Sequence, residues 1–262
     1  MRTDEDEQLP VEGSMSFLDH LEELRKRLIS GSAAVLILSI TAFTFHKEIL
    51  EILMIPYREI MGDEAKLQTI APLESFYVSV KLSFLSGFFA GAPFLLYQAW
   101  KFIAPGLYPS ERKWVVPFVT LGTVFFFSGA AFGFFVVFPM VVSFLSEFNL
   151  EVVSSQYTLE KYVSFASLIL LSFGFVFEFP LVLTILLSIG LVQRKTLVEK
   201  RMLFYVIAFV CGAVLTPPDV ISQCLLASVL IIFYEVVLLI SKLTSIGNRE
   251  NSNEISPDNE LN

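Results

Sequence analysis

The chain has few of the residues on which enzyme and metal sites depend. Its 262 residues include two cysteines and two histidines, and His20 and His46 stand far apart from each other. Cys211 and Cys224 lie inside apolar segments without a CxxC pair, a setting typical of small buried side chains rather than of a disulfide. The chain contains no HExxH, GxSxG or P-loop motif and no pair of aspartates within its apolar stretches. The sequence therefore predicts no enzyme, no metal centre and no cofactor.

A basic surface is also missing. Asp and Glu outnumber Lys and Arg by 26 to 18, which gives a net charge of −8, whereas nucleic-acid binding requires positive charge. What the chain has instead is apolar bulk: 55% of its residues are hydrophobic, 27 are Phe, and the mean hydropathy is +0.68. This composition is typical of an all-α protein that crosses a lipid bilayer several times, and it excludes nucleic acid as a partner.

Six apolar stretches fit helical crossings of a bilayer, each of which needs about 20 residues. They cover residues 28–45, 76–103, 115–138, 162–191, 201–216 and 220–240. The third stretch stops just before Pro139, which is predicted to lie past the end of its helix. Between Arg201 and Thr216, the fifth has only about 14 residues and would extend roughly 21 Å, short of the ~30 Å hydrocarbon core. We predict a six-helix domain over residues 15–245, with short fifth and sixth helices that leave a concave face.

The two ends of the chain are polar. Residues 1–14 are acidic and residues 246–262 are rich in Asn, Glu and Ser, so both are predicted to be disordered tails. The acidic segment leaves both Met1 and Met15 open as the start of translation. Most of the 18 Lys and Arg residues fall on the side of the two termini. By the positive-inside rule, this distribution predicts that both termini are cytoplasmic.

The segment before the first apolar stretch has apolar residues at helical spacing over residues 16–28. We interpret it as a short amphipathic helix along the membrane surface. On this helix Glu22 is four residues before Lys26, and Glu23 is four before Arg27. We interpret both as solvated pairs, each contributing about 0.3 to 0.5 kcal/mol to helix stability.

Two carboxylates lie inside apolar stretches. Glu178 is near the middle of the fourth stretch, where an ionisable side chain costs at least a few kcal/mol unless it faces protein or water. It is therefore predicted to face inward, next to a kink at Pro180. Glu235 is closer to the end of its stretch, and a structural role is as well supported there as a functional one.

Five motifs together resemble the TatC family, the polytopic receptors of the twin-arginine protein translocase. They are HLEELRKRL (20–28), GAPFLLYQAWKFIAPGLYPSERK (91–113), FVVFPM (135–140), SFGFVFEFP (172–180) and LTPPDVISQ (215–223). The resemblance extends over residues 17–242. It implies a six-helix, glove-shaped bundle in the bacterial inner membrane.

The resemblance also implies a function and a set of site residues. TatC-like proteins bind twin-arginine signal peptides and, with TatA/TatB-type single-span proteins, export folded proteins using the proton-motive force, as part of an oligomeric receptor complex. The recognition carboxylates match two glutamates, with an arginine beside the first, and the mid-membrane glutamate matches Glu178. The residues implied in signal-peptide binding are Glu23, Arg25 and Glu111. The polar residues grouped with partner docking are Thr216, Asp219 and Gln223.

Two other functions compete with that of a receptor. A secondary transporter would use Glu178 as a proton or cation site, and it would be expected to have related halves and broken helices. The first and last three stretches show no such internal repeat. A purely structural scaffold for membrane partners would leave the cytoplasmic carboxylates and Glu178 without a role.

Overall fold

The computed structural model of the chain describes residues 17–62, 66–103, 115–147, 157–216 and 219–244. The regular elements in these ranges are helices, and Gln68 and Thr158 form an isolated β-bridge. The predicted tails lie outside the described residues. The elements in chain order are α1 (Phe17–Phe43), α2 (His46–Leu53), α3 (Ile55–Met61), α4 (Glu74–Ile103), α5 (Val115–Phe132), the π-helix η3 (Gly133–Val137), α6 (Phe138–Glu147), α7 (Leu159–Ser188), α8 (Arg194–Glu199), α9 (Arg201–Leu215) and α10 (Val220–Leu243).

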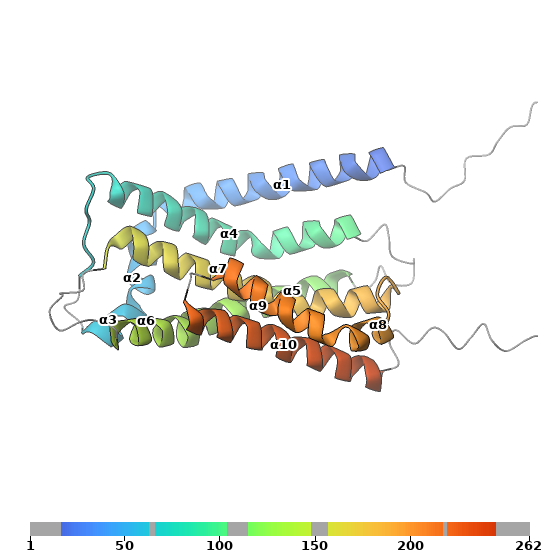
Figure 1. Cartoon of the computed structure of the whole chain (residues 1–262). Coiled ribbons are helices and arrows are strands. Elements are labelled where there is room, and N and C mark those ends of the chain that lie inside the picture. Colours follow the sequence, from blue (N-terminus) through green and yellow to red (C-terminus); the bar gives the residue numbers. More distant parts are fainter. Residues whose placement is uncertain (1–16, 63–65, 104–114, 148–156, 217–218, 245–262) are drawn as a thin grey trace, which may run out of the picture.

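The long helices pack mainly against their neighbours along the chain. Helix α1 packs along α4, α4 along α5 and α7, α5 along α7, and α10 along α7 and α9. Figure 1 shows α1 at one edge of the bundle and the α9–α10 hairpin at the other, with the start of α1 and the end of α10 at the same end. Helices α2, α3 and α6 lie at the opposite end. The bundle is therefore open along α1, which has α4 as its main neighbour.

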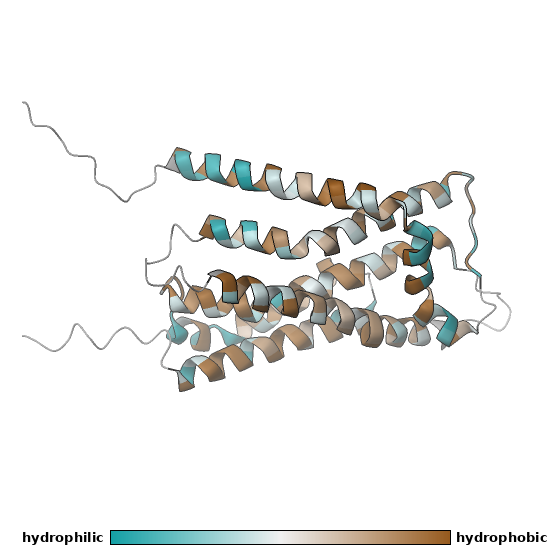
Figure 2. Ribbon diagram, turned by 180° about the vertical axis from the view of Figure 1, so that it is seen from behind, coloured by the Kyte–Doolittle hydropathy of each residue, from teal (hydrophilic) through white to brown (hydrophobic). Residues whose placement is uncertain are grey.

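Five helical segments in the described ranges are long and apolar enough to cross a membrane. They are Leu18–Phe43, Glu74–Ile103, Val116–Phe144, Leu159–Ser188 and Val220–Leu243. Figure 2 shows polar residues at the two ends of the bundle and hydrophobic residues between them. This distribution matches a bilayer with two aqueous faces.

The fifth and sixth predicted helices differ in length from each other. Helix α9 has 15 residues and does not reach the length of a full crossing, as predicted. Helix α10 is longer than predicted, because it continues past Ile240 to Leu243; its 24 residues extend about 36 Å. The α9–α10 hairpin nevertheless turns back before the end where α2 and α3 lie (Figure 1).

One continuous helix stands in place of the predicted surface helix and first span. Helix α1 runs unbroken from Phe17 to Phe43, so the prediction of a separate helix along the membrane surface is wrong. The segment has no proline, and Gly31 is buried where a Cβ would lie 2.9 Å from Leu95 of α4. Nothing in this sequence interrupts the helical hydrogen bonds, so the polar start continues in line with the apolar part.

The third crossing also continues where the sequence predicted an end. Segments η3 and α6 prolong α5 past Pro139 as far as Glu147, so the prediction that the helix stops before Pro139 is wrong. Proline has no N–H to offer the preceding turn. The chain adopts the wider π-helical turn over Gly133–Val137, which ends two residues before this proline. Such a turn spaces the backbone around the missing donor and lets the helix continue.

Glycines bring helix backbones close together at two crossings. On α4, a Cβ added to Gly87 would lie 2.5 Å from the backbone nitrogen of Ser39 on α1. On α5, a Cβ added to Gly129 would overlap the carbonyl oxygen of Phe173 on α7. Small residues permit this approach between membrane helices, whose association depends on close packing.

We predict that Gly87→Ala destabilises the protein and that Gly91→Ala, one turn further along α4, does not. At Gly91 the new Cβ would meet side-chain atoms of Val35 and Leu38 at 3.3 and 3.4 Å, and these side chains can move slightly. At Gly87 it would meet backbone, so the helices must separate, at a cost of about 1 to 3 kcal/mol. Thermal unfolding of both variants in mild detergent measures the difference. Equal unfolding temperatures would contradict the close crossing.

Candidate functional site

The start of α1 and the end of α4 enclose a polar cavity of about 510 Å³, which we call the acidic pocket. It lies at the end of the bundle where α1 starts and α10 ends (Figure 1). Its carboxylates come from the first turns of α1, and one residue, Gln98, comes from α4. The lining residues are Asp19, Glu22, Glu23, Lys26, Arg27, Ser30 and Gln98.

The helical repeat explains why these side chains meet. Residues three, four and seven apart lie on one face of an α-helix, and the lining positions of α1 follow this spacing from Asp19 to Ser30. The same face turns toward α4, against which α1 packs. Three carboxylates therefore share one small cavity with two cationic side chains.

A hydrogen-bonded network crosses the acidic pocket from α1 to α4. The Glu23 carboxylate accepts a bond from the Arg27 guanidinium at 2.7 Å, and a second guanidinium nitrogen donates to the Gln98 Oε1 at 3.1 Å. The Gln98 side-chain nitrogen donates in turn to the Ser30 hydroxyl at 3.3 Å. The second carboxylate oxygen of Glu23, Oε2, is buried and has no hydrogen-bond partner among the described residues.

The two i, i+4 pairs of α1 differ in their exposure. The Lys26–Glu22 pair, at 2.8 Å, is solvated as predicted, with side chains 73% and 62% exposed. The Arg27–Glu23 side chains are only 23% and 17% exposed, so the prediction of a solvated pair is wrong there. Helix α4 covers this second pair and supplies Gln98 to it. A charge pair shielded in this way is stronger and more strictly oriented than one on a solvated face.

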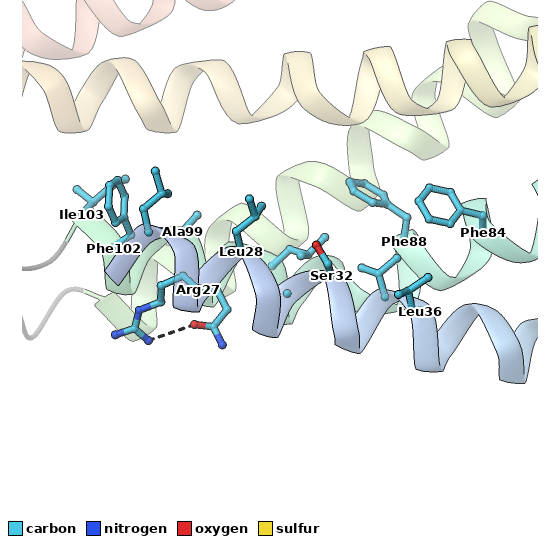
Figure 3. Close-up of a pocket in the computed structure, with 14 residues that line it drawn as sticks. Arg27, Leu28, Ser32, Leu36, Phe84, Phe88, Ala99, Phe102 and Ile103 are labelled. Atoms are coloured by element: carbon cyan, nitrogen blue, oxygen red, sulfur yellow. Dashed lines mark hydrogen bonds between the residues drawn. The ribbon is translucent and has the colours of Figure 1, made fainter. Parts of the chain in front are cut away.

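An apolar groove of about 660 Å³ adjoins the acidic pocket between the same two helices. Arg27 and Gln98 line both cavities. Figure 3 shows Arg27 near one end of the groove, with Phe84 and Phe88 toward the other. Between these ends, its walls are mainly aliphatic and aromatic side chains. The acidic pocket and the apolar groove are therefore continuous along α1.

Of the two other predicted recognition residues, the structure describes one. Arg25 is exposed and lines neither the acidic pocket nor the apolar groove. Glu111 lies outside the described residues. Of the two predicted binding residues in the described part of the chain, Glu23 lines the cavity and Arg25 does not.

Glu178 lies apart from these cavities, in the middle of α7. It is 8% exposed, so the prediction that it faces inward is confirmed. Its carboxylate packs against α5 at Gly122, where a Cβ would come within 3.1 Å of the Glu178 Oε2. The other oxygen, Oε1, is buried without a hydrogen-bond partner in the described part of the chain. Glycine at position 122 provides the space that this carboxylate occupies.

Comparison with known proteins identifies the family and the fold. The family model for Sec-independent protein translocase protein (TatC) matches residues 19–228, which include both walls of the acidic pocket and Glu178. This chain belongs to the TatC family. Two solved structures share its fold; one, described as the twin-arginine translocase receptor TatC, has a TM-score of 0.77 and 36% identity over 86% of this chain and 99% of the other.

Curated TatC proteins from several bacteria match along most of the chain. The Sec-independent protein translocase protein TatC of Halothiobacillus neapolitanus is 41% identical over 230 residues, which are 88% of this chain and 63% of that protein. The one from Desulforapulum autotrophicum is 37% identical over 238 residues, or 91% of this chain and 87% of that protein. These translocase relatives do not favour a secondary transporter built around Glu178.

A further polar network joins the TatC helices α9 and α10 at the end where the acidic pocket lies. The Glu235 carboxylate accepts a bond from the Tyr205 hydroxyl at 2.8 Å and pairs with the Arg201 guanidinium at 3.2 Å. Both partners come from α9, and Glu235 comes from α10. These contacts favour the structural alternative for Glu235 over a functional one.

The predicted docking residues lie around the turn between α9 and α10. Thr216 is 4% exposed, and its hydroxyl donates to the Gly212 carbonyl at 2.8 Å. Asp219 is the N-cap of α10 and accepts the backbone N–H of Ser222 at 2.7 Å. Gln223 is less enclosed and donates to the Phe209 carbonyl at 3.2 Å. The structure thus gives all three residues local contacts, and it buries Thr216 more deeply than Asp219 and Gln223.

Two residues of the TatC pocket were missed by the sequence reasoning. Gln98 completes the contacts of Arg27, and Ser30 accepts a bond from Gln98. Gln98 stands within the 91–113 motif as a polar residue in an apolar helix, and that contrast was a usable signal. Ser30 offered no comparable signal, because single serines are common in membrane helices.

Proposed function

We propose that this TatC-family protein is the membrane receptor for twin-arginine signal peptides, with the arginines bound in the acidic pocket. The observation that carries the proposal is the continuity of this pocket with the apolar groove. Targeting signals of the secretory type have a positively charged segment followed by 7 to 15 apolar residues. The acidic pocket and the apolar groove follow each other along α1 in the same order as the charged and apolar segments of such a signal.

The chemistry of the pocket suits guanidinium groups. Guanidinium ions form charge-assisted and often two-pronged bonds with carboxylates, and such bonds are strongest at sites shielded from water. Glu23 supplies a shielded carboxylate, already oriented by its contact with Arg27. The nearby lysines and arginines are hydrogen-bond donors only, so they do not compete as acceptors.

The receptor orientation follows from the charge of the loops. We infer that the acidic pocket faces the cytoplasm of a bacterium and that both termini are on that side of the inner membrane, since basic residues gather there. In this orientation a signal peptide arriving from the cytoplasm meets the pocket first. Transport of the folded cargo then depends on the proton-motive force and on other subunits.

We also propose that a single-span partner of the TatA/TatB type docks along α9. This helix is too short to cross the bilayer fully, and it presents an exposed apolar stripe at Val206, Val210 and Val214. Gln223 of α10 contacts Phe209 of α9, next to Val210 of this stripe. It offers a partner a hydrogen bond worth about 0.6 to 2 kcal/mol in lipid. Further copies of the receptor and its partners would then form the oligomeric complex.

The receptor proposal predicts that the purified protein captures a twin-arginine precursor in preference to its twin-lysine counterpart, and that Glu23→Gln reduces this capture by roughly tenfold or more. Removing one member of a shielded charge pair typically costs about 2 to 5 kcal/mol, against under about 1 for an exposed one. Glu22→Gln, one residue away on the solvated pair, should therefore change capture by less than about threefold. Co-purification in mild detergent measures all three proteins, and equal capture of the two precursors would refute the proposal.

The apolar groove predicts a second, separate effect. Ser32→Phe places a ring in the groove and should weaken precursor binding about five- to tenfold by occupying the space of the apolar segment, a loss of about 1 to 1.4 kcal/mol. The matched control is Ile40→Phe, on the same helix at a position 73% exposed and outside the groove lining. Binding of a labelled precursor measures both. Equal affinities for the two variants would show that the apolar segment binds elsewhere.

Partner docking predicts crosslinks from one helix. Cysteines introduced at Val210 or Val214 of α9 should crosslink to a cysteine in the partner's single span, because this face is exposed and the helix lacks a lipid-spanning length. The control is a cysteine at Ile37 of α1, a side chain that is 66% exposed and therefore equally reachable from the lipid. Crosslinking from Ile37 alone would contradict the α9 docking site.

A further inference from the structure

We infer that Arg27 occupies the Glu23 carboxylate in the free protein, and that an arginine of the signal peptide must displace Arg27 in order to bind there. The inference rests on the proposed function and deepens it, because it names a residue that sets the affinity of the same site. Arg27 belongs to the chain itself, yet its guanidinium makes with Glu23 the contact expected of a peptide arginine.

Arg27 lies in the path that a bound peptide would take. It lines both the acidic pocket and the apolar groove, so a segment that passes from one to the other crosses over its side chain (Figure 3). Its guanidinium is held from two sides, by Glu23 on α1 at 2.7 Å and by Gln98 on α4 at 3.1 Å. Release therefore breaks a contact with each wall.

The carboxylate of Glu23 is only half used in this arrangement. Arg27 contacts Oε1, and Oε2 is buried without a hydrogen-bond partner among the described residues. A guanidinium that binds a carboxylate through two parallel bonds needs both oxygens. A peptide arginine that used both oxygens would share Oε1 with the Arg27 guanidinium, and because the two cations repel each other, Arg27 must leave. A lysine ammonium is a point donor that needs one oxygen only, so it gains less than a guanidinium does when Arg27 leaves.

This difference gives the inference a measurable consequence. Removing the internal guanidinium with Arg27→Gln should tighten binding of a twin-arginine peptide about three- to tenfold, since the peptide no longer breaks the existing pair. Binding of the twin-lysine peptide should change by less than about twofold. Gln98→Leu keeps Glu23 and Arg27 but removes the hydrogen bond between Arg27 and Gln98. It should therefore tighten twin-arginine binding by a smaller factor than Arg27→Gln does.

The experiment is a fluorescence-anisotropy titration of the full chain in mild detergent with synthetic peptides that carry Arg-Arg or Lys-Lys before the same apolar segment. Lys101→Gln is the charge control: it removes one positive charge from the same end of α4, where Lys101 lies over the Tyr97 ring and lines neither cavity. Titrations at about 0.15 and 0.5 M salt separate contact from long-range attraction, which salt screens. Tightening by Arg27→Gln that persists at high salt, and that Lys101→Gln lacks, supports the inference.

Several outcomes would overturn it. Binding that weakens in Arg27→Gln, as in Glu23→Gln, would make Arg27 a part of the binding surface, and affinity within twofold of the original would show that no displacement occurs. Arg27→Lys, measured beside it, keeps the positive charge and supplies a second test if Arg27→Gln unfolds early in detergent; it should tighten binding less than Arg27→Gln. The original protein reports on the proposed function separately: equal affinity for the two peptides there refutes the receptor role, whatever the variants do.

Discussion

The packing of α1 against α4 is the contact on which both cavities depend. The helix backbones come close together where Gly87 meets Ser39, and Figure 1 shows the two helices diverging toward the end where α1 starts. The groove and the acidic pocket occupy this divergence, with one wall from each helix. A bulkier residue at the crossing would alter the angle and spacing of both walls together. The absence of a side chain at Gly87, in the middle of α4, thus affects the shape of a site at the end of that helix.

The Glu22–Lys26 and Glu23–Arg27 pairs show how far a local pattern can predict a site. Both pairs have the same spacing on the same helix, and sequence reasoning gave them the same interpretation. They differ because Gln98, 71 residues further along than Arg27, contacts only one of them. The burial of Glu23 results from the packing of α4 against α1, which the spacing of residues along α1 cannot predict. The resemblance to a family named Glu23 as a recognition residue, but it did not show that Glu23 contacts Arg27 in the free protein.

Other parts of the fold were predictable for physical reasons that act within one segment. The apolar stretches, the short α9 and the inward position of Glu178 follow from the cost of polar groups in a bilayer, which applies residue by residue. The helix boundaries were less predictable. The continuity of α1 and the passage of the third crossing through Pro139 depend on whether a helix tolerates a polar start or a missing donor. Packing and the π-helical turn decide those questions, and neither can be read from hydropathy.

The order in which the helices pack bears on how the chain is made. Most of the long contacts join consecutive crossings: α1 with α4, α4 with α5, α5 with α7, and α9 with α10. Chains emerge from the ribosome N-terminus first, and contacts between segments near in sequence form fastest. Both walls of the acidic pocket belong to the first two crossings. They can therefore associate in the membrane while α7, α9 and α10 are still being synthesised.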